Sequence, residues 1–228
     1  MGMKAKITLG AVVGIVVIGA VSANAGSDGK NSGSGGDKGS SASTGHTSAT
    51  KGSGDARAAG KKKAAIAGDG EYRVGSDVKP GTYRTTGNTD DMCYWERAKD
   101  AKGEVDSLLA NDNVTGTSYV TVKATDKVFK SSGCEDWEAV DPKAKGTPAS
   151  SMDGDGGMYK VGTDIAPGTY RSAGNTGDSC YWERTKDAAH GLDSIIANNN
   201  VKGTAVVTIG PNDAYFKTTG CGDWKKAA

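Results

Sequence analysis

Aromatic and arginine side chains that occur twice at the same spacing are the residues with the clearest capacity for binding chemistry. Trp95 and Arg97 stand two residues apart in the stretch CYWER, and Trp182 and Arg184 repeat that arrangement. Residues two apart on a β-strand share one face, so each Trp–Arg pair could stack on a sugar ring and hold a carboxylate or phosphate. The candidate ligand-binding set is Tyr83, Trp95, Arg97, Trp137, Tyr170, Trp182, Arg184 and Trp224.

The same side chains also have a structural interpretation, which the sequence favours. Trp95 would pack against a disulfide in the core, and Arg97 would pair with a nearby acid. Tyr94 directly precedes Trp95, so the two rings face opposite sides of the strand and one of them is expected in the core.

Catalytic constellations are weak in this sequence, and we expect no enzyme. The chain has two histidines, His46 in a Gly/Ser-rich segment and His190 where the first copy has Gly103. A catalytic base must be held rigidly, which neither position favours. Acids shared by both copies, such as Glu96 and Glu183, formally allow a paired-carboxylate glycosidase. Many of the shared acids, however, stand beside Gly or Asn, which is typical of turns.

Metal-binding patterns are incomplete, and we expect neither a metal nor a cofactor. Asn111-Asp112-Asn113 is rich in the oxygen ligands that suit calcium, but the second copy reads Asn198-Asn199-Asn200 and loses the carboxylate. Zinc sites need closely spaced cysteines with partner histidines, and the four cysteines of this chain lack that spacing.

The candidates recur because one domain has been duplicated. A shift of 87 residues places residues 72–137 on residues 159–224 without a gap, with 38 identities over 66 positions. Each copy is about 70 residues long, and a domain of that size usually needs a disulfide or a metal to be stable.

The cysteines can meet that need by forming disulfides. Four cysteines allow three pairings, and duplication favours the pairing inside each copy, Cys93–Cys134 and Cys180–Cys221, because a single ancestral domain had to satisfy its own two thiols. Closing such a loop stabilises a domain by roughly 4 kcal/mol in the chain-entropy model. We therefore expect each repeat to fold alone.

Secondary structure is predicted to be β throughout, since short runs of β-branched and aromatic residues alternate with turn signals. In the first copy the expected strands cover residues 72–74, 82–85, 93–97, 105–109, 118–122 and 128–130. The predicted fold class is all-β, with two small antiparallel β-sandwich or jelly-roll-like domains in tandem, each with one disulfide.

The N-terminus is typical of an export signal. Lys4 and Lys6 precede an uncharged apolar run over residues 7–21, and Ala23-Asn24-Ala25 fits a cleavage site. The alternative is an uncleaved membrane anchor over residues 7–25, which is close to the length needed to span a bilayer. We favour cleavage, and either alternative places the remaining chain outside the cytoplasm.

Composition divides the rest of the chain. The predicted segments are a signal or anchor at 1–25, a disordered Gly/Ser/Lys linker at 26–67, repeat 1 at 68–140, a second linker at 141–156 and repeat 2 at 157–228. Residues 26–67 hold 7 Lys or Arg against 3 Asp, whereas residues 68–228 hold 19 basic against 24 acidic residues. The folded part is mildly acidic, which argues against nucleic acid as a partner.

The repeated motifs resemble a known family. The pattern VGxD(V/I)xPGTYR, followed by CYWER and a late GCxxW, resembles a repeat found in small secreted proteins and lipoproteins of actinobacteria, and in modules that larger actinobacterial proteins carry outside the membrane. The resemblance covers both copies, about 60% of the chain. It implies a secreted or cell-envelope location and transfers no activity. Lipoproteins carry a lipidated Cys after the apolar run, and this chain has none there.

Taken together, these features predict a non-enzymatic binding module of the cell envelope. Two tethered copies would recognise a repetitive target such as cell-wall polysaccharide, or a surface protein, since linkage raises avidity without new contacts. The alternative is a stalk or surface-display protein without a specific ligand, and a small secreted hydrolase is a third and weaker alternative.

Overall fold

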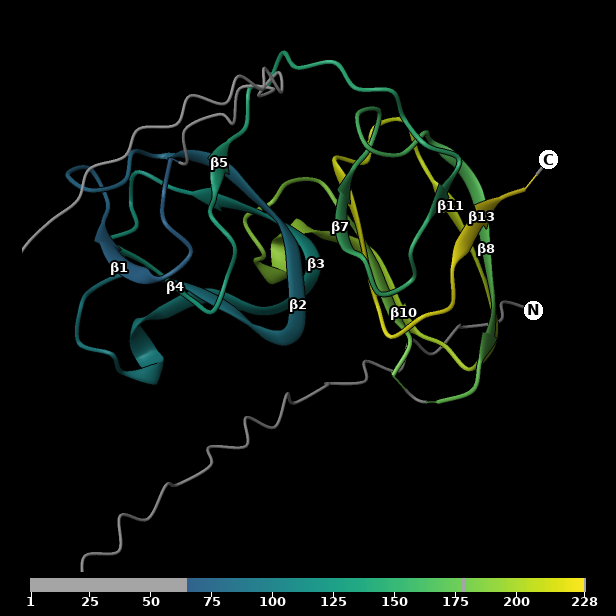
Figure 1. Cartoon of the computed structure of the whole chain (residues 1–228), viewed down its shortest axis with the longest axis horizontal. Coiled ribbons are helices and arrows are strands. Elements are labelled where there is room, and N and C mark those ends of the chain that lie inside the picture. The colour runs from purple at the N-terminus through teal and green to yellow at the C-terminus, as the bar shows by residue number, and fades with distance from the viewer. Residues whose placement is uncertain (1–64, 178, 228) are drawn as a thin grey trace, which may run out of the picture. The chain divides into compact units, whose positions relative to one another are not determined.

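The computed structural model describes residues 65–177 and 179–227 (Figure 1). The predicted signal or anchor at 1–25, most of the predicted linker and His46 lie outside the described residues. Within the described ranges, no helix is long and apolar enough to cross a membrane.

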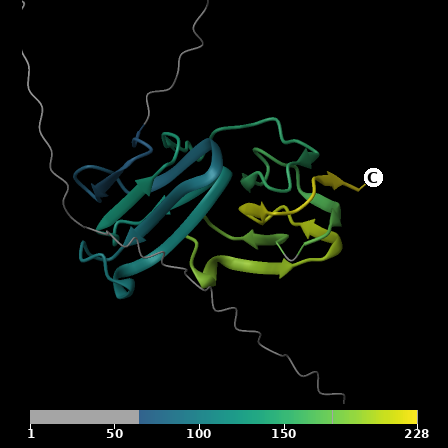
Figure 2. The same cartoon turned by 60° about the horizontal axis from the view of Figure 1, so that its bottom comes forward.

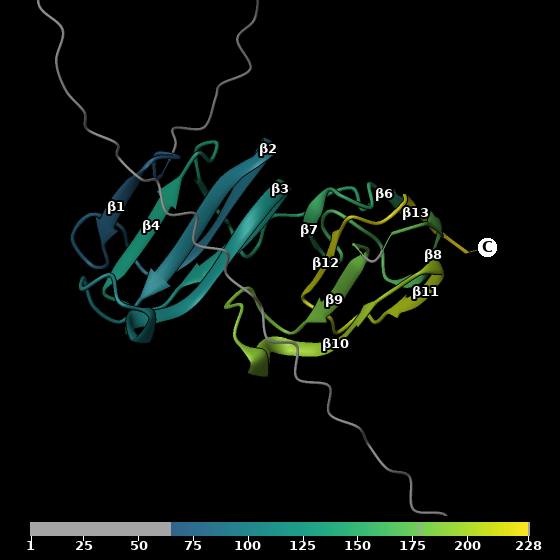
Figure 3. The ribbon, with the colours of Figure 1, turned by 90° about the horizontal axis from the view of Figure 1, so that it is seen from below.

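Repeat 1 is organised around one long hairpin. Its elements are β1 Gly70–Arg73, β2 Gly81–Ala98, the 3-10 helix η1 Val105–Ser107, β3 Leu108–Val122, β4 Val128–Ser132 and β5 Glu138–Ala139. Strands β2 and β3 pair antiparallel along their lengths, β4 pairs with the second half of β2 and with β1, and β5 pairs with the first half of β2. Figure 3 shows β1, β4, β2 and β3 side by side in that order.

In repeat 2 the equivalent strands are distributed over two sheets (Figure 2). Its elements are β6 Ser151–Met152, β7 Gly157–Lys160, β8 Gly168–Asn175, β9 Tyr181–Thr185, the 3-10 helix η2 Leu192–Ser194, β10 Ile195–Asn200, β11 Gly203–Ile209, β12 Tyr215–Thr219 and β13 Trp224–Lys226. Strands β7, β12, β9 and β10 lie in one sheet, and β11, β8, β13 and β6 form the other. The segments equivalent to β8 and β9 are continuous as β2 in repeat 1, where register shifts interrupt the ladder between Thr85 and Cys93.

The predicted all-β class is confirmed. The named strands of each repeat pair antiparallel with one another, and the buried positions alternate along them, as in Gly203–Ile209 with Ala205, Val207 and Ile209 inside. Alternation of this kind buries one face of each strand and leaves the other in solvent. The predicted segment 105–109 is an exception, because η1 replaces its first half. There the Ser107 amide donates to the Glu104 carbonyl at 2.9 Å and closes a turn.

Each repeat has its own core and its own disulfide. The core of repeat 1 centres on Trp95, Phe129 and Trp137, and that of repeat 2 on Phe216 and Trp224. The bridges are Cys93–Cys134 and Cys180–Cys221, which is the pairing expected from the duplication. Each bridge ties the segment after the last long strand back to the CYWER strand.

Two predicted linker boundaries need correction. Ile66, assigned to the first linker, is buried in the core of repeat 1 and forms a bridge with Trp137. Met152, assigned to the second linker, is buried in the core of repeat 2 because β6 pairs with β13. Composition alone could not separate these short pairing segments from the Gly/Ser-rich chain around them.

The two repeats belong to one compact unit and share a junction. Strand β3 of repeat 1 pairs with β7 of repeat 2 through a parallel bridge between Thr117 and Gly157. Gly157 has φ +83°, and a Cβ there would collide with the Thr117 carbonyl oxygen, so this approach requires glycine. The two tandem domains are therefore in direct contact as well as being joined by the linker.

A small apolar cluster lies at the junction. It consists of Tyr119 from β3 of repeat 1 and of Met158, Ala188 and Tyr215 from repeat 2, with the Tyr119 and Tyr215 ring centroids 5.0 Å apart. The Thr121 amide also donates to the Ala188 carbonyl at 2.7 Å. These contacts fasten β3 of repeat 1 against repeat 2.

Candidate functional site

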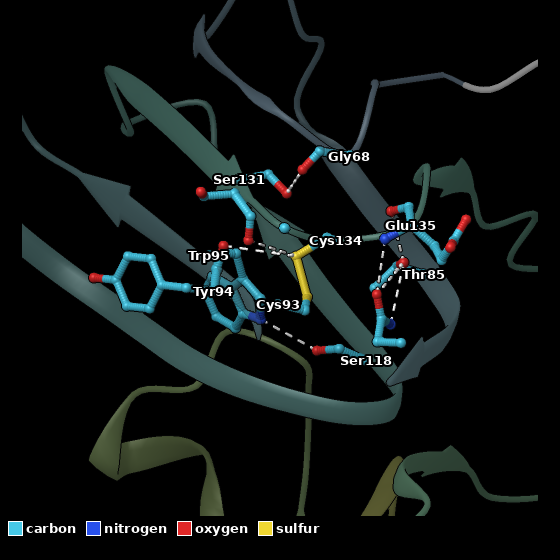
Figure 4. Close-up of a disulfide and its surroundings, with 12 residues drawn as sticks. Gly68, Thr85, Cys93, Tyr94, Trp95, Ser118, Ser131, Cys134 and Glu135 are labelled. Carbon is cyan, nitrogen blue, oxygen red and sulfur yellow. Dashed lines mark hydrogen bonds between the residues drawn. A yellow bond between two sulfur atoms is a disulfide. The ribbon is translucent and has the colours of Figure 1, made fainter. Parts of the chain in front are cut away.

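Most of the predicted ligand-binding aromatic residues are core residues. Tyr83, Trp95, Trp137, Tyr170 and Trp224 are all buried, and the three Trp side chains are fully enclosed. Figure 4 shows Trp95 beside the disulfide, where its Nε1 donates to Ser118 Oγ at 3.2 Å. The prediction that these rings stack on a ligand is corrected, because a fully enclosed ring has no face free for one.

The two arginines of the predicted set form ion pairs with shared acids. Arg97 Nε lies 2.6 Å from Asp126 Oδ2, and Arg184 Nε lies 2.6 Å from Asp213 Oδ2. The second guanidinium nitrogen of each arginine completes a bidentate pair. This is the structural interpretation that the sequence favoured. Trp182, the remaining member of the set, is half-buried against the core of repeat 2.

Several shared acids close turns. Asp77 accepts a hydrogen bond from the Arg73 amide at 2.9 Å, which holds the pKa of Asp77 below its usual value. Asp100 accepts one from Ser107 Oγ, which likewise lowers the pKa of Asp100. Asp187 and Ser194 repeat the latter contact in repeat 2. These acids stabilise local backbone turns, as their Gly- and Asn-rich surroundings indicate.

The strongest candidate site is a polar pocket beside the junction, with a volume of about 190 Å³. We call it the junction pocket. Repeat 2 supplies nearly all of its lining through β7, β9, β12 and η2, and repeat 1 supplies Asn111 from β3. The lining residues are Asn111, Met158, Tyr181, Glu183, Thr185, His190, Gly191, Ser194, Ile195 and Lys217.

A cross-repeat ion pair stands at one side of this pocket. Lys217 Nζ lies 2.6 Å from both carboxylate oxygens of Asp112 in repeat 1. Glu183 is the cross-strand neighbour of Lys217 and is buried. Burial disfavours the charged lysine, but the carboxylates of Asp112 and Glu183 outweigh burial and raise the pKa of Lys217. The Asp112 carboxylate, considered above for calcium, is occupied by this lysine.

Glu183 has a second fixed partner. The Tyr181 hydroxyl donates to Glu183 Oε2 at 2.7 Å. Burial raises the pKa of Tyr181, and the adjacent Glu183 carboxylate raises it further. At neutral pH, Tyr181 is therefore a neutral hydrogen-bond donor that orients the carboxylate.

His190 lies half-buried at the junction. Its Nε2 lies 2.7 Å from the Tyr119 carbonyl oxygen, and its ring meets Trp95 edge-on at 4.7 Å between centroids. Burial lowers the pKa of His190. Because a carbonyl only accepts, Nε2 carries the proton and Nδ1 holds a lone pair. Its backbone has φ +55°, where Gly103 of repeat 1 has +70°.

Thr185 contributes an unsatisfied hydroxyl. Its side chain lines the junction pocket, the residue is 3% exposed, and Oγ1 has no hydrogen-bond partner among the described residues. A buried hydroxyl without a partner carries a free-energy cost. Repeat 1 has Ala98 at the equivalent position, so the shared fold does not require this hydroxyl.

The junction pocket was not predicted, although the sequence contains a signal for it. Residues that build the junction differ between the copies: Met158 replaces Glu71, Thr185 replaces Ala98, His190 replaces Gly103 and Tyr215 replaces Val128. Conversely, Tyr119 is buried at the junction while its counterpart Val206 is 62% exposed. Identities between the copies mark the common fold, and these differences mark the surface where the copies meet.

Among the described residues, no group of three or more His, Cys, Asp or Glu side chains is arranged to hold a metal ion. The acids nearest the pocket are engaged by Lys217 and Tyr181 instead.

Comparisons with known proteins place the chain in a family. The family model described as the Rv1352-like extracellular domain matches residues 64–138 and 150–225. The chain is 31% identical over 97 residues to uncharacterized protein Rv1352 of Mycobacterium tuberculosis strain H37Rv and to uncharacterized protein Mb1387 of Mycobacterium bovis. Each match covers 37% of this chain and 78% of the relative. No solved structure matches.

The family match and the two disulfides agree on location. Disulfides form and persist in oxidising compartments outside the cytoplasm, and the matching model describes an extracellular domain. The protein is therefore extracytoplasmic. It belongs to the Rv1352-like extracellular domain family and carries that domain twice.

Proposed function

We propose that this protein is a non-enzymatic binding module of the cell envelope whose ligand site is the junction pocket. The observation that carries the proposal is the buried Thr185 hydroxyl, which belongs to a residue that lines this pocket and has no hydrogen-bond partner among the described residues. A ligand that supplies the missing hydrogen bond would remove the cost of leaving the hydroxyl unpaired. The polar lining suits a ligand rich in polar groups, such as a fragment of cell-wall polysaccharide.

The proposal replaces two equivalent sites with one composite site. The aromatic residues that the duplication repeats are enclosed in the two cores, whereas Thr185 and His190 of the junction pocket are replaced by Ala98 and Gly103 in repeat 1. On this proposal, duplication did not create a second binding site. It created a second copy of the domain, whose surface could then diverge to form a single site.

A non-enzymatic role agrees with the state of the polar groups. His190 donates from Nε2 to a backbone carbonyl, and the Glu183 carboxylate is held by Tyr181. A catalytic base must lie within hydrogen-bond reach of the substrate proton that it removes. The hydrogen bonds of His190 and Glu183 are made within the protein and stabilise its structure instead.

Thr185→Val tests the proposal with little risk to the fold. Valine has nearly the same shape and removes only the unpaired hydroxyl, so we expect thermal stability to be unchanged or higher. Retention of the purified full chain on isolated cell-wall material should fall by about fivefold to tenfold, the loss of one hydrogen bond of about 1 to 1.5 kcal/mol.

Thr219→Val is the matched control, since that hydroxyl lies on an exposed side of β12 and bonds to Asp155. Its retention should equal that of the unsubstituted chain. If Thr185→Val binds wall material as well as the unsubstituted chain, the junction pocket is not the ligand site.

A second candidate function is rigid display at the cell surface. It is favoured by the cross-repeat contacts, in which Arg97 Nη1 donates to the Ala189 carbonyl at 2.6 Å and Lys217 pairs with Asp112. Such contacts would hold the repeats as one body without any ligand. Display predicts no saturable binding to wall material by either variant above.

A further inference from the structure

The charges around the junction pocket do not cancel. Asp112 and Glu183 contribute two carboxylates, and Lys217 is the single ammonium beside them. His190 adds no charge at neutral pH, because desolvation lowers its pKa further below neutrality. One negative charge therefore remains beside a partly open pocket, next to buried groups whose electrostatic interactions are stronger than in water.

The hydrogen-bonding groups of the pocket also favour a positively charged donor. Both of the short contacts of Lys217 go to Asp112. The lining donors Tyr181 and Ser194 are likewise used within the protein, by Glu183 and Asp187. The lining residues Glu183, His190, Asn111 and Thr185 have side chains that can accept hydrogen bonds. A complementary ligand group must therefore carry several donors and a positive charge.

From this arrangement we infer that the junction pocket binds a primary ammonium group, held by the Glu183 carboxylate and Thr185 Oγ1, on a small hydroxyl-bearing or amino-acid-like ligand. An ammonium supplies three donors and the missing positive charge in one group. The volume of about 190 Å³ exceeds the space of a lone ammonium and leaves room for the ligand atoms that carry it. This inference rests on the proposed function and specifies its ligand class.

Repeat 1 provides an internal control for the role of Glu183. Glu96 is its counterpart and accepts the Tyr94 hydroxyl at 2.6 Å, as Glu183 accepts Tyr181. Around Glu96, however, Thr185 is replaced by Ala98 and His190 by Gly103, and Lys130 is exposed. The same carboxylate–tyrosine pair thus occurs with and without the neighbouring Thr185 hydroxyl and His190 ring.

The test is a calorimetric titration of the full chain with matched amines. D-glucosamine and N-acetyl-D-glucosamine form one pair, and L-lysine and Nε-acetyl-L-lysine the other, so that the arms distinguish an amino sugar from an amino-acid side chain. We expect the free amine of at least one pair to bind at least about tenfold more tightly than its acetylated partner, as loss of a charged hydrogen bond implies.

Glu183→Gln should weaken binding of that amine by about tenfold or more, and Glu96→Gln should leave it unchanged. Thermal melting of both variants checks that they are folded. Should Glu183→Gln fail to fold, Thr185→Val serves in its place, with weaker amine binding expected.

Three outcomes would overturn the inference in different ways. Equal binding of free and acetylated amines that still depends on Thr185 would reject the ammonium class and keep the pocket as the binding site. Retention on wall material that depends on Thr185, without binding of any amine, would also reject the ammonium class and keep the pocket as the binding site. Absence of any binding, to amines or to wall material, would reject the proposed function itself.

Discussion

Removal of the first disulfide by combined Cys93→Ala and Cys134→Ala substitutions is expected to unfold repeat 1 while the core of repeat 2 remains folded. The bridge closes a loop with a sequence separation of 41 residues, and in the chain-entropy model this contributes about 4 kcal/mol. A domain of about 70 residues has a net stability of similar size. Replacing both cysteines avoids a free thiol that could form wrong disulfides.

Repeat 2 should be affected less, but measurably. Its core around Phe216 and Trp224 is separate from that of repeat 1, but unfolding of repeat 1 would remove Tyr119 from the junction cluster. A loss of about 1 kcal/mol corresponds to a melting temperature lower by roughly 4 to 8 °C for a domain of this size.

Differential scanning calorimetry of the full chain would resolve the two transitions. The matched variant Cys180→Ala with Cys221→Ala should reverse the pattern and unfold repeat 2. If either variant melted as the unsubstituted chain does, the disulfide would not be needed for stability. One shared transition would instead show that the junction makes both repeats a single cooperative unit.

Asp126→Ala is expected to cost about 3 to 5 kcal/mol of unfolding free energy, because it leaves the Arg97 guanidinium buried without its counter-charge. The side chains of Arg97 and Asp126 are 3% and 1% exposed. Asp126 also accepts the Lys123 amide at 2.7 Å, so its loss removes a turn contact as well.

The equivalent change in repeat 2, Asp213→Ala, should cost clearly less. Arg184 makes the same bidentate contact, but its side chain is 24% exposed, so water can solvate the guanidinium once the partner is gone. In repeat 1 the junction closes over Arg97, whose Nη1 donates to Ala189 of repeat 2. Urea unfolding of both variants measures the difference, and equal losses would mean that the junction does not cover Arg97 in solution.

Much of the fold could be predicted from the sequence because the duplication itself is informative. Alternating β-branched and aromatic residues identify strands, and the repeated cysteines indicate the pairing Cys93–Cys134 and Cys180–Cys221. The alternation rule also separated Tyr94 from Trp95 and placed Trp95 with Arg97 on one face, which the structure buries. Strand ends were less predictable, since the turn at Ser107 is held by the Glu104 carbonyl and the Asp100 carboxylate rather than by pairing with a neighbouring strand.

The candidate site could not be predicted in the same way. Thr185, His190 and Lys217 come from β9, the loop before η2, and β12, and they converge only when the sheet of repeat 2 is formed. Asp112 reaches Lys217 across 105 residues of sequence, which no local pattern encodes. The aromatic residues attracted attention because they recur, but recurrence here reflects a shared core.

The ligand stoichiometry in the calorimetric titration tests the central claim most directly, because it counts sites on the intact chain. A site that needs both repeats predicts one ligand per chain, with binding lost in the Cys93→Ala and Cys134→Ala variant, where unfolded repeat 1 no longer provides Asn111 and Asp112. Two ligands per chain, or binding that survives the unfolding of repeat 1, would contradict the account and return the binding site to the individual repeat.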